Sequence, residues 1–235
     1  MDTFIYDADY KRDLRERAHP FGEVSFLEAL AQPGMTALDI GANKGLTTVA
    51  IAKAIAPQGR VYAFEPVPDY YRTLQANLAR NQVRNAKAFC AALGHTIGRI
   101  DYYKDGGASG IVAHDQSDKI SVESTTLDDF VEDEGLGRVD LISMDCEGSE
   151  LFVFQGGERT LTSCPLSLFC EIHREALKAL GQSLRDVVSW LERRGFQVKP
   201  VFVDDLDNNV GYERCTHILA SRQGPARDSG GPAQA

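Results

Sequence analysis

The chain is predicted to form one α/β domain around a seven-stranded, mostly parallel sheet with a reversed last strand and helices on both faces. Two observations predict this fold. Apolar strand-like runs alternate with helical segments along most of the chain, and only a short polar segment separates the last two runs, 196–204 and 215–222. Alternation is typical of parallel sheets covered by helices. A short polar connection favours an antiparallel pair.

Each element is expected from its local pattern. Helices end where Pro or Gly follows an amphipathic segment, and Ser183 is placed to cap the last helix, which Gly195 stops. The expected strands are 35–41, 60–66, 86–94, 139–148, 165–173 and the two final runs, and the expected helices are 24–31, 46–56, 68–81, two short ones within 149–164, and 183–195.

The chain divides into a core domain with extensions. Residues 1–34 are expected to be a helical lead-in or cap, and 35–222 the main domain. A Gly-, Ser- and Asp-rich stretch at about 97–125 predicts an inserted hairpin and loop. The tail 223–235 has a disordered composition.

Composition and charge argue against several classes of function. The 235 residues carry a net charge of −9, which argues against binding to nucleic-acid phosphates. No apolar run approaches the roughly 18 residues of a membrane span, and the N-terminus lacks an apolar signal core. Five cysteines without a C-x-x-C pair favour neither structural zinc nor a disulfide framework. We expect a soluble, cytoplasmic protein that does not bind membranes.

The stretch "TALDIGANKG" predicts a ligand-binding turn after the first strand. Asp39 lies near the strand's end, and Gly41 and Gly45 flank the turn into the next helix. Ligands of open α/β sheets bind at such carboxyl ends. Glu65 ends the second strand, where an acid can accept both hydroxyls of a ribose.

The turn favours S-adenosylmethionine over a dinucleotide. A dinucleotide turn needs closely spaced glycines so that a pyrophosphate can approach the helix N-terminus. Here Ala42, Asn43 and Lys44 occupy that place. The Asp39 carboxylate would repel a pyrophosphate, but it suits the ammonium end of S-adenosylmethionine, either directly or through water.

Several ordered motifs together resemble the FkbM family of S-adenosylmethionine-dependent methyltransferases. They are "LDIGANKGLTTVAIAK", "GRVYAFEPVPDYYRTLQANLARN", "AALG", "TTLDDFVEDEGLGRVDLISMDCEGSELFVFQGG" and "EIH", and they span about residues 36–173. The resemblance implies a class I methyltransferase fold and O-methylation of a hydroxyl on a small natural product or sugar.

The resemblance also assigns a cofactor site. Glu65 falls on the ribose acid, and Cys90 stands where the family often has a polar residue, so the Ala91 backbone is the better candidate beside the adenine. The residues implied for the cofactor are Asp39, Gly41, Ala42, Asn43, Gly45, Glu65, Pro66, Val67, Cys90, Ala91 and Asp145.

Acids and a histidine at the ends of the fourth and fifth strands are the catalytic candidates. In one interpretation Asp145 or His173 removes the acceptor proton and Glu171 orients the histidine. In the other, Asp145, Glu147, Glu171 and His173 supply ligands of a divalent ion such as Mg²⁺. Because Mg²⁺ prefers oxygen ligands, the metal-free base is preferred.

The sequence leaves other activities open. An N-methyltransferase on the same fold and a non-catalytic module for an adenosine-type ligand are the alternatives. The expected partner is a small-molecule hydroxyl acceptor, and a homodimer is possible.

Overall fold

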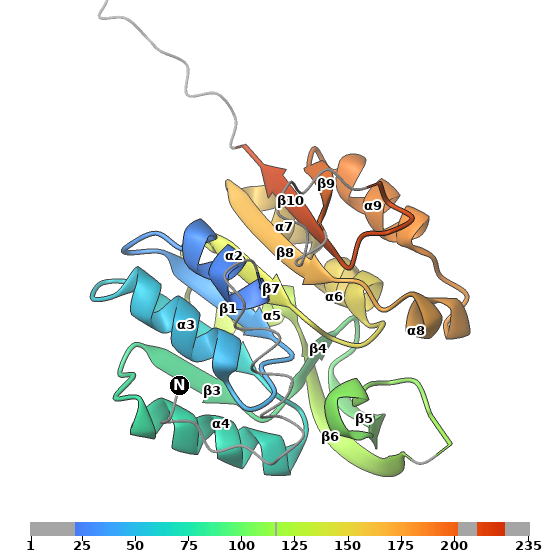
Figure 1. Ribbon diagram of the computed structural model, residues 1–235, viewed down its shortest axis with the longest axis horizontal. Coiled ribbons are helices and arrows are strands. Elements are labelled where there is room, and N and C mark those ends of the chain that lie inside the picture. Colours follow the sequence, from blue (N-terminus) through green and yellow to red (C-terminus); the bar gives the residue numbers. More distant parts are fainter. Residues whose placement is uncertain (1–21, 116, 202–210, 224–235) are drawn as a thin grey trace, which may run out of the picture.

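A seven-stranded sheet forms the centre of the molecule. The computed structural model describes residues 22–115, 117–201 and 211–223. The strands are β1 (Thr36–Ile40), β2 (Arg60–Phe64), β3 (Ala86–Phe89), β7 (Leu141–Met144), β8 (Leu166–Glu171), β9 (Gln197–Val201) and β10 (His217–Arg222). Their order is β3-β2-β1-β7-β8-β10-β9 (Figure 1). β10 pairs antiparallel with β8 and β9, whereas the other neighbours pair in parallel. The predicted sheet with a reversed last strand is confirmed.

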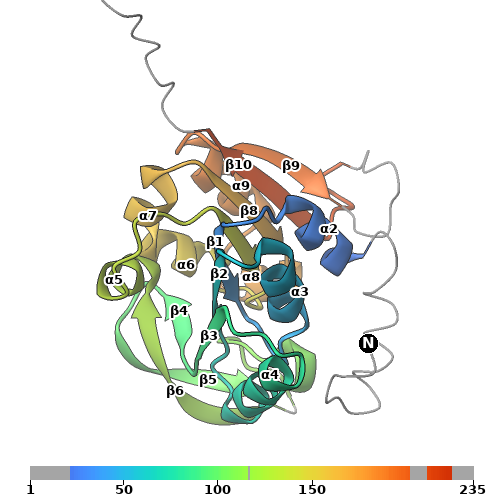
Figure 2. The same ribbon diagram turned by 90° about the vertical axis from the view of Figure 1, so that its left-hand side faces the viewer.

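Helices cover both faces of this sheet, as predicted (Figure 2). One face carries α2 (Glu23–Leu30), α3 (Leu46–Ile55) and α4 (Pro68–Arg80), and the other carries α5 (Leu127–Asp133), α6 (Glu150–Gly156), α7 (Glu158–Ser163) and α9 (Leu184–Glu192). The short helix α8 (Arg174–Ala179) follows β8. Neither α5 nor α8 was predicted from the sequence.

Strand alternation decides which side chains meet which helices. Leu38 and Ile40 pack into the core beneath α6, whereas Ala37 packs toward α2 and α3. Asp39 points to the same side as Ala37, because successive side chains of a strand face opposite ways. This placement explains an acid inside an apolar strand: its carboxylate meets the beginning of α3.

The cap predicted for the last helix is confirmed. Ser183 Oγ accepts a hydrogen bond from the backbone N–H of Asp186. Gly195 follows α9 with φ +83°, a conformation that favours glycine. Val187, Val188, Trp190 and Leu191 are the buried residues of this helix.

A second sheet of three strands adjoins the first and is seen at the lower right of Figure 1. It contains β4 (Ala92–Gly94), β5 (Gly98–Lys104) and β6 (Asp118–Thr126) in the order β4-β6-β5, with a 3-10 turn at Gly106–Ala108. β5 and β6 form the predicted hairpin. The single strand predicted over 86–94 is wrong: the chain leaves the main sheet after Phe89, and β4 joins β6 instead.

The extensions lie largely outside the described residues. Of the predicted lead-in, only residues 22–34 are described, and of the tail only residue 223. The domain limits drawn from the sequence therefore stay predictions. Within the described part of the chain, each helix is too short or too polar to cross a membrane.

Candidate active site

The turn after β1 is shaped by a close backbone contact. Gly41 has φ +83°, and its N–H donates to the carbonyl of Phe64 at 3.0 Å. A Cβ on Gly41 would lie 1.7 Å from the carbonyl oxygen of Asp145. Asp145 N–H in turn donates to the carbonyl of Ile40 at 2.9 Å. Only glycine fits here, and the turn lies directly against the segment that follows β7.

Asn43 and Glu65 connect the turn to the end of β2. Asn43 has φ +47°, an uncommon backbone conformation for a residue other than glycine. Its N–H donates to Glu65 Oε2 at 2.8 Å, and the N–H of Val67 donates to Glu65 Oε1 at 2.7 Å. Among the described residues, the buried Oδ1 of Asn43 has no hydrogen-bond partner. A strained backbone and a buried polar atom without a partner are both common at ligand-binding sites.

Burial raises the pKa of Glu65 to about 7, although the hydrogen bonds from Val67 and Asn43 oppose the shift. The side chain is 4% exposed. Each carboxylate oxygen accepts one backbone N–H and has a second lone pair. Glu65 can therefore accept further hydrogen bonds from a diol.

Asp39 accepts hydrogen bonds from hydroxyl groups of the protein itself. Its Oδ2 accepts from Thr47 Oγ1 at 2.9 Å and from Thr48 Oγ1, both in the first turn of α3. Burial raises the pKa of Asp39, while these hydrogen bonds and one from Ser143 oppose the rise. The structure thus shows that Asp39 joins β1 to α3. Its predicted role toward an ammonium group stays a prediction.

An apolar cavity of about 220 Å³ opens beside the turn, between the main sheet and the three-stranded sheet. Gly41, Pro66 and Ala91 line it, as do Cys146 and Ser149 from the segment after β7. Other walls are formed by Ile40, Phe64, Leu93, Tyr102, Ile111 and Phe152. The cavity suits a flat, largely apolar group next to Glu65.

Two residues predicted for the cofactor, Val67 and Cys90, are not among those that line the cavity. Val67 is 1% exposed and begins α4 by donating to Glu65. The Cys90 thiol lies 3.9 Å from the carbonyl oxygen of Pro66, within reach of a weak hydrogen bond. Burial raises the pKa of this thiol. Of the neighbouring pair, Ala91 rather than Cys90 lines the cavity.

The candidate catalytic residues gather around one imidazole. His173 Nε2 lies 3.4 Å from Asp145 Oδ1, 3.3 Å from Glu147 Oε1 and 3.8 Å from Glu171 Oε1. Its Nδ1 lies 3.3 Å from Oε1 of the fully buried Glu150. We call these four acids and His173 the acid–histidine cluster. The candidates named from the sequence were Asp145, Glu147, Glu171 and His173, and the structure adds Glu150 to them.

This cluster retains protons at neutral pH. Burial acts against a charged imidazole, but the hydrogen bond with Glu150 and the charges of Asp145, Glu147 and Glu171 outweigh it and raise the pKa of His173 to about 10. Burial raises the pKa of Glu147 to about 8, even though His173 lowers it. His173 is therefore an imidazolium at neutral pH unless another cation takes its place.

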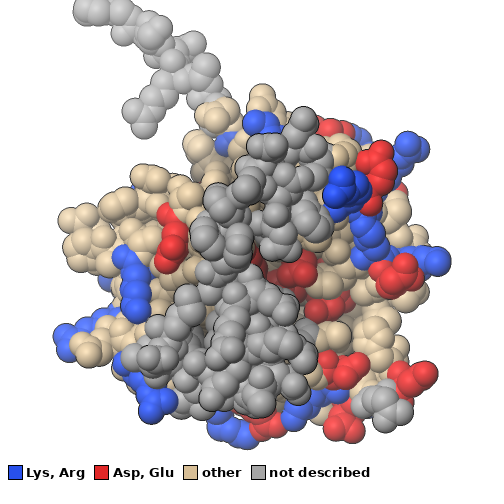
Figure 3. Space-filling view, viewed as in Figure 1, with Lys and Arg blue, Asp and Glu red and all other residues tan. Residues whose placement is uncertain are grey.

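Acidic atoms form a patch near the middle of the face seen in Figure 3, and both acidic and basic atoms lie toward its edges. Within the acid–histidine cluster, Asp145, Glu171 and His173 offer ligand atoms within 4.8 Å of one another. Glu147 does not belong to that group. The metal alternative raised from the sequence thus has three suitable donors, and it stays a prediction.

The inserted loop reaches the acid–histidine cluster. Tyr102 OH donates to the carbonyl of Ser109 at 2.7 Å, and Tyr103 and Gly110 exchange backbone hydrogen bonds. A Cβ on Gly110 would lie 3.0 Å from Cβ of Glu147. Glu147 itself has φ +49°. The loop therefore packs directly against Glu147 and forms one wall of this region.

The fold is that of class I methyltransferases. Among solved structures, the chain resembles the O-methyltransferase TomG from Streptomyces achromogenes with a TM-score of 0.57 and 14% identity, covering 92% of this chain and 86% of that one. It also resembles the O-methyltransferase from Bacillus cereus, with a TM-score of 0.55 and 15% identity, covering 93% and 92%. At such low identity these likenesses show the shared fold.

The family model described as "Methyltransferase FkbM domain" matches residues 39–198. This chain belongs to the FkbM methyltransferase family, as the sequence motifs indicated. The 2-O-methyltransferase NoeI of Sinorhizobium fredii is 30% identical over 158 residues, which cover 59% of this chain and 63% of NoeI. The 31-O-demethyl-FK506 methyltransferase FkbM of Streptomyces tacrolimicus is 26% identical over 199 residues, covering 71% and 74%. This chain thus spans somewhat less than two thirds of NoeI.

Proposed function

We propose that the protein transfers the methyl group of S-adenosylmethionine to a hydroxyl oxygen of a small molecule. Membership of the FkbM methyltransferase family supports the reaction class. The names of NoeI and FkbM, both O-methyltransferases, support an oxygen acceptor. The net charge of −9 favours a small molecule over a nucleic acid.

The residues of the turn fit this methyl donor. The apolar cavity beside Pro66 and Ala91 suits an adenine ring. Glu65 has lone pairs left for the two ribose hydroxyls, and the buried Asn43 Oδ1 can accept from the donor's ammonium group. When bound, S-adenosylmethionine supplies an electrophilic methyl group on a sulfonium. The residues of the chain must then orient the acceptor and receive its proton.

One contact carries the proposal: Asp145 belongs both to the donor turn and to the acid–histidine cluster. Its backbone carbonyl lies against Gly41, and its carboxylate faces His173 at 3.4 Å. An acceptor hydroxyl next to Asp145 would therefore be close to the donor site. Proximity of this kind supplies much of the rate enhancement in group transfer.

We assign the acceptor's proton to Asp145. The raised pKa of His173 makes its imidazolium a hydrogen-bond donor at neutral pH rather than a base. His173 then stabilises the Asp145 carboxylate, and Glu171 and Glu150 hold the ring in place. A positioned carboxylate that removes a hydroxyl proton contributes typically 10²–10⁴-fold to rate.

The experiment measures methyl transfer from S-adenosylmethionine with a labelled methyl group. The acceptors are 31-O-demethyl-FK506, which one relative's name gives as its substrate, and a panel of sugars and alcohols with matched amines. We expect at least one hydroxyl compound to be labelled, with the methyl on oxygen by NMR.

Two results would overturn the proposal. Labelling of amines alone would make the protein an N-methyltransferase. Binding of S-adenosylhomocysteine without transfer to any compound would favour a non-catalytic module.

A further inference from the structure

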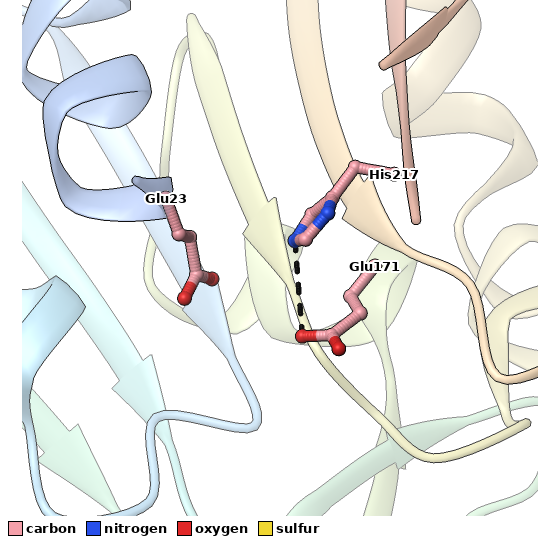
Figure 4. A group of neighbouring side chains, drawn as sticks. All are labelled: Glu23, Glu171 and His217. Atoms are coloured by element: carbon pink, nitrogen blue, oxygen red, sulfur yellow. Dashed lines mark ion pairs between the residues drawn. The ribbon is translucent and has the colours of Figure 1, made fainter. Parts of the chain in front are cut away.

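A second group of ligating side chains shares Glu171 with the acid–histidine cluster. Its other members are Glu23 and His217 (Figure 4). The three residues come from α2, β8 and β10, and each offers one atom within 4.8 Å of the others. Glu23 is 5% and His217 4% exposed. His217 Nε2 lies 3.7 Å from Glu171 Oε2. These buried donors from three separate elements converge on one point.

Aromatic stacking fixes this convergence. Phe169 stacks on Phe26 at 5.7 Å and on the His217 ring at 4.8 Å, with interplanar angles of 11° and 15°. Glu23 precedes Phe26 by one helical turn, and Glu171 lies two residues after Phe169 on the same face of β8. His217 pairs directly with Glu171 across the sheet. The stack therefore aligns all three ligating side chains before any ion binds.

The orientation of the His217 ring also suits a metal. His217 Nδ1 lies 2.9 Å from Thr216 Oγ1. When Nδ1 donates its proton to that hydroxyl oxygen, Nε2 keeps a lone pair and faces the two carboxylates. A histidine ligand is usually held this way, by a hydrogen bond from its other ring nitrogen.

We propose that Glu23, Glu171 and His217 bind one divalent transition-metal ion, Mn²⁺ or Zn²⁺. Two carboxylates balance the charge of such an ion, and a nitrogen ligand favours these ions over Mg²⁺. The ion would fasten α2 to the ends of β8 and β10. It uses Glu171 Oε2, whereas Oε1 is the oxygen facing His173.

The test titrates the full chain, stripped with EDTA, with MnCl₂ and ZnCl₂ by calorimetry, together with metal analysis of the dialysed complex. We expect one ion to bind and the midpoint of thermal unfolding to rise by about 5 °C under saturating metal. Glu23→Gln and His217→Asn should each weaken binding at least about tenfold. Glu28→Gln, an exposed acid on α2, is the matched control and should bind normally.

Asp145→Asn separates this site from the acid–histidine cluster and should keep the ion. The proposal is overturned if the stripped protein binds neither metal. It is also overturned if Glu23→Gln and His217→Asn bind as tightly as the unchanged chain, or if only Asp145→Asn loses the ion. Circular dichroism checks that each variant folds. If His217→Asn does not fold, metal binding by Glu23→Gln alone decides the test.

Discussion

The proposed donor and acceptor halves of the site use acidic residues in different ways. On the donor side, Asp39 and Glu65 accept hydrogen bonds from nearby hydroxyls and backbone N–H groups, and so they hold the turn in shape. On the acceptor side, acids lie near both ring nitrogens of His173 and keep it protonated. Buried acids can therefore stabilise backbone geometry in one part of a site and keep a histidine protonated in the neighbouring part.

The largest effect is expected where the two halves touch. Gly41→Ala places a Cβ against the Asp145 carbonyl. We expect the free energy of unfolding to fall by more than about 3 kcal/mol, and donor binding to become undetectable. Gly34→Ala is the matched control, because Gly34 has φ +85° with nothing within 4 Å of the added Cβ. It should cost about 1 to 2 kcal/mol, the backbone strain alone. Equal losses in urea unfolding of the two variants would refute the close contact.

Glu65 should make donor binding depend on pH. Its pKa of about 7 lies above the ordinary value of 4.5, so the carboxylate that accepts ribose hydroxyls forms mainly as pH rises from 6 to 8. Affinity for S-adenosylhomocysteine, measured by calorimetry, should rise over that range. Glu65→Gln should bind about tenfold more weakly at pH 8 and without this dependence.

Glu65 should also make the stability of the unliganded protein depend on pH, in the opposite direction to donor binding. Burial favours protonated Glu65, so its contribution to folding is fully present below pH 4.5 and is lost as pH rises through about 7. In the absence of ligand, Glu65→Gln should remove this part of the decline in thermal stability. A decline identical to that of the unchanged chain would show that Glu65 is ionised throughout.

On the acceptor side, Glu150→Gln should lower the pKa of His173. The variant keeps the size of a fully buried side chain but removes the charge next to Nδ1. We expect the pKa of His173, followed by NMR, to fall from about 10 by about 1 pH unit or more. Glu175→Gln, an exposed acid on α8, should leave it unchanged. An unaltered pKa in Glu150→Gln would contradict the role given to Glu150.

The donor side was largely predictable because its parts are close in sequence. The strand, the glycines and Glu65 form a continuous βα pattern, and the spacing fixes their position at the sheet edge. What the pattern did not show was the partner of Asp39. The side that Asp39 faces follows from strand alternation, yet Thr47 and Thr48 looked like ordinary residues of an amphipathic helix.

The acceptor side was only partly predictable. Asp145, Glu171 and His173 stand out because they end two neighbouring strands. Glu23 and His217, which belong to the proposed metal site, lie far apart in the sequence, and neither is part of a motif. Their approach depends on packing of Phe26 against Phe169, a tertiary contact that no local pattern reveals.

The most direct test of the account compares Asp145→Asn with Glu175→Gln in donor affinity and in rate of methyl transfer, using an acceptor found in the hydroxyl panel. We predict that Asp145→Asn still binds S-adenosylhomocysteine but transfers methyl groups at least about 100-fold more slowly, while Glu175→Gln matches the unchanged protein. Full turnover with normal donor binding in Asp145→Asn would contradict the claim that the donor turn and the acid–histidine cluster meet at this residue for catalysis.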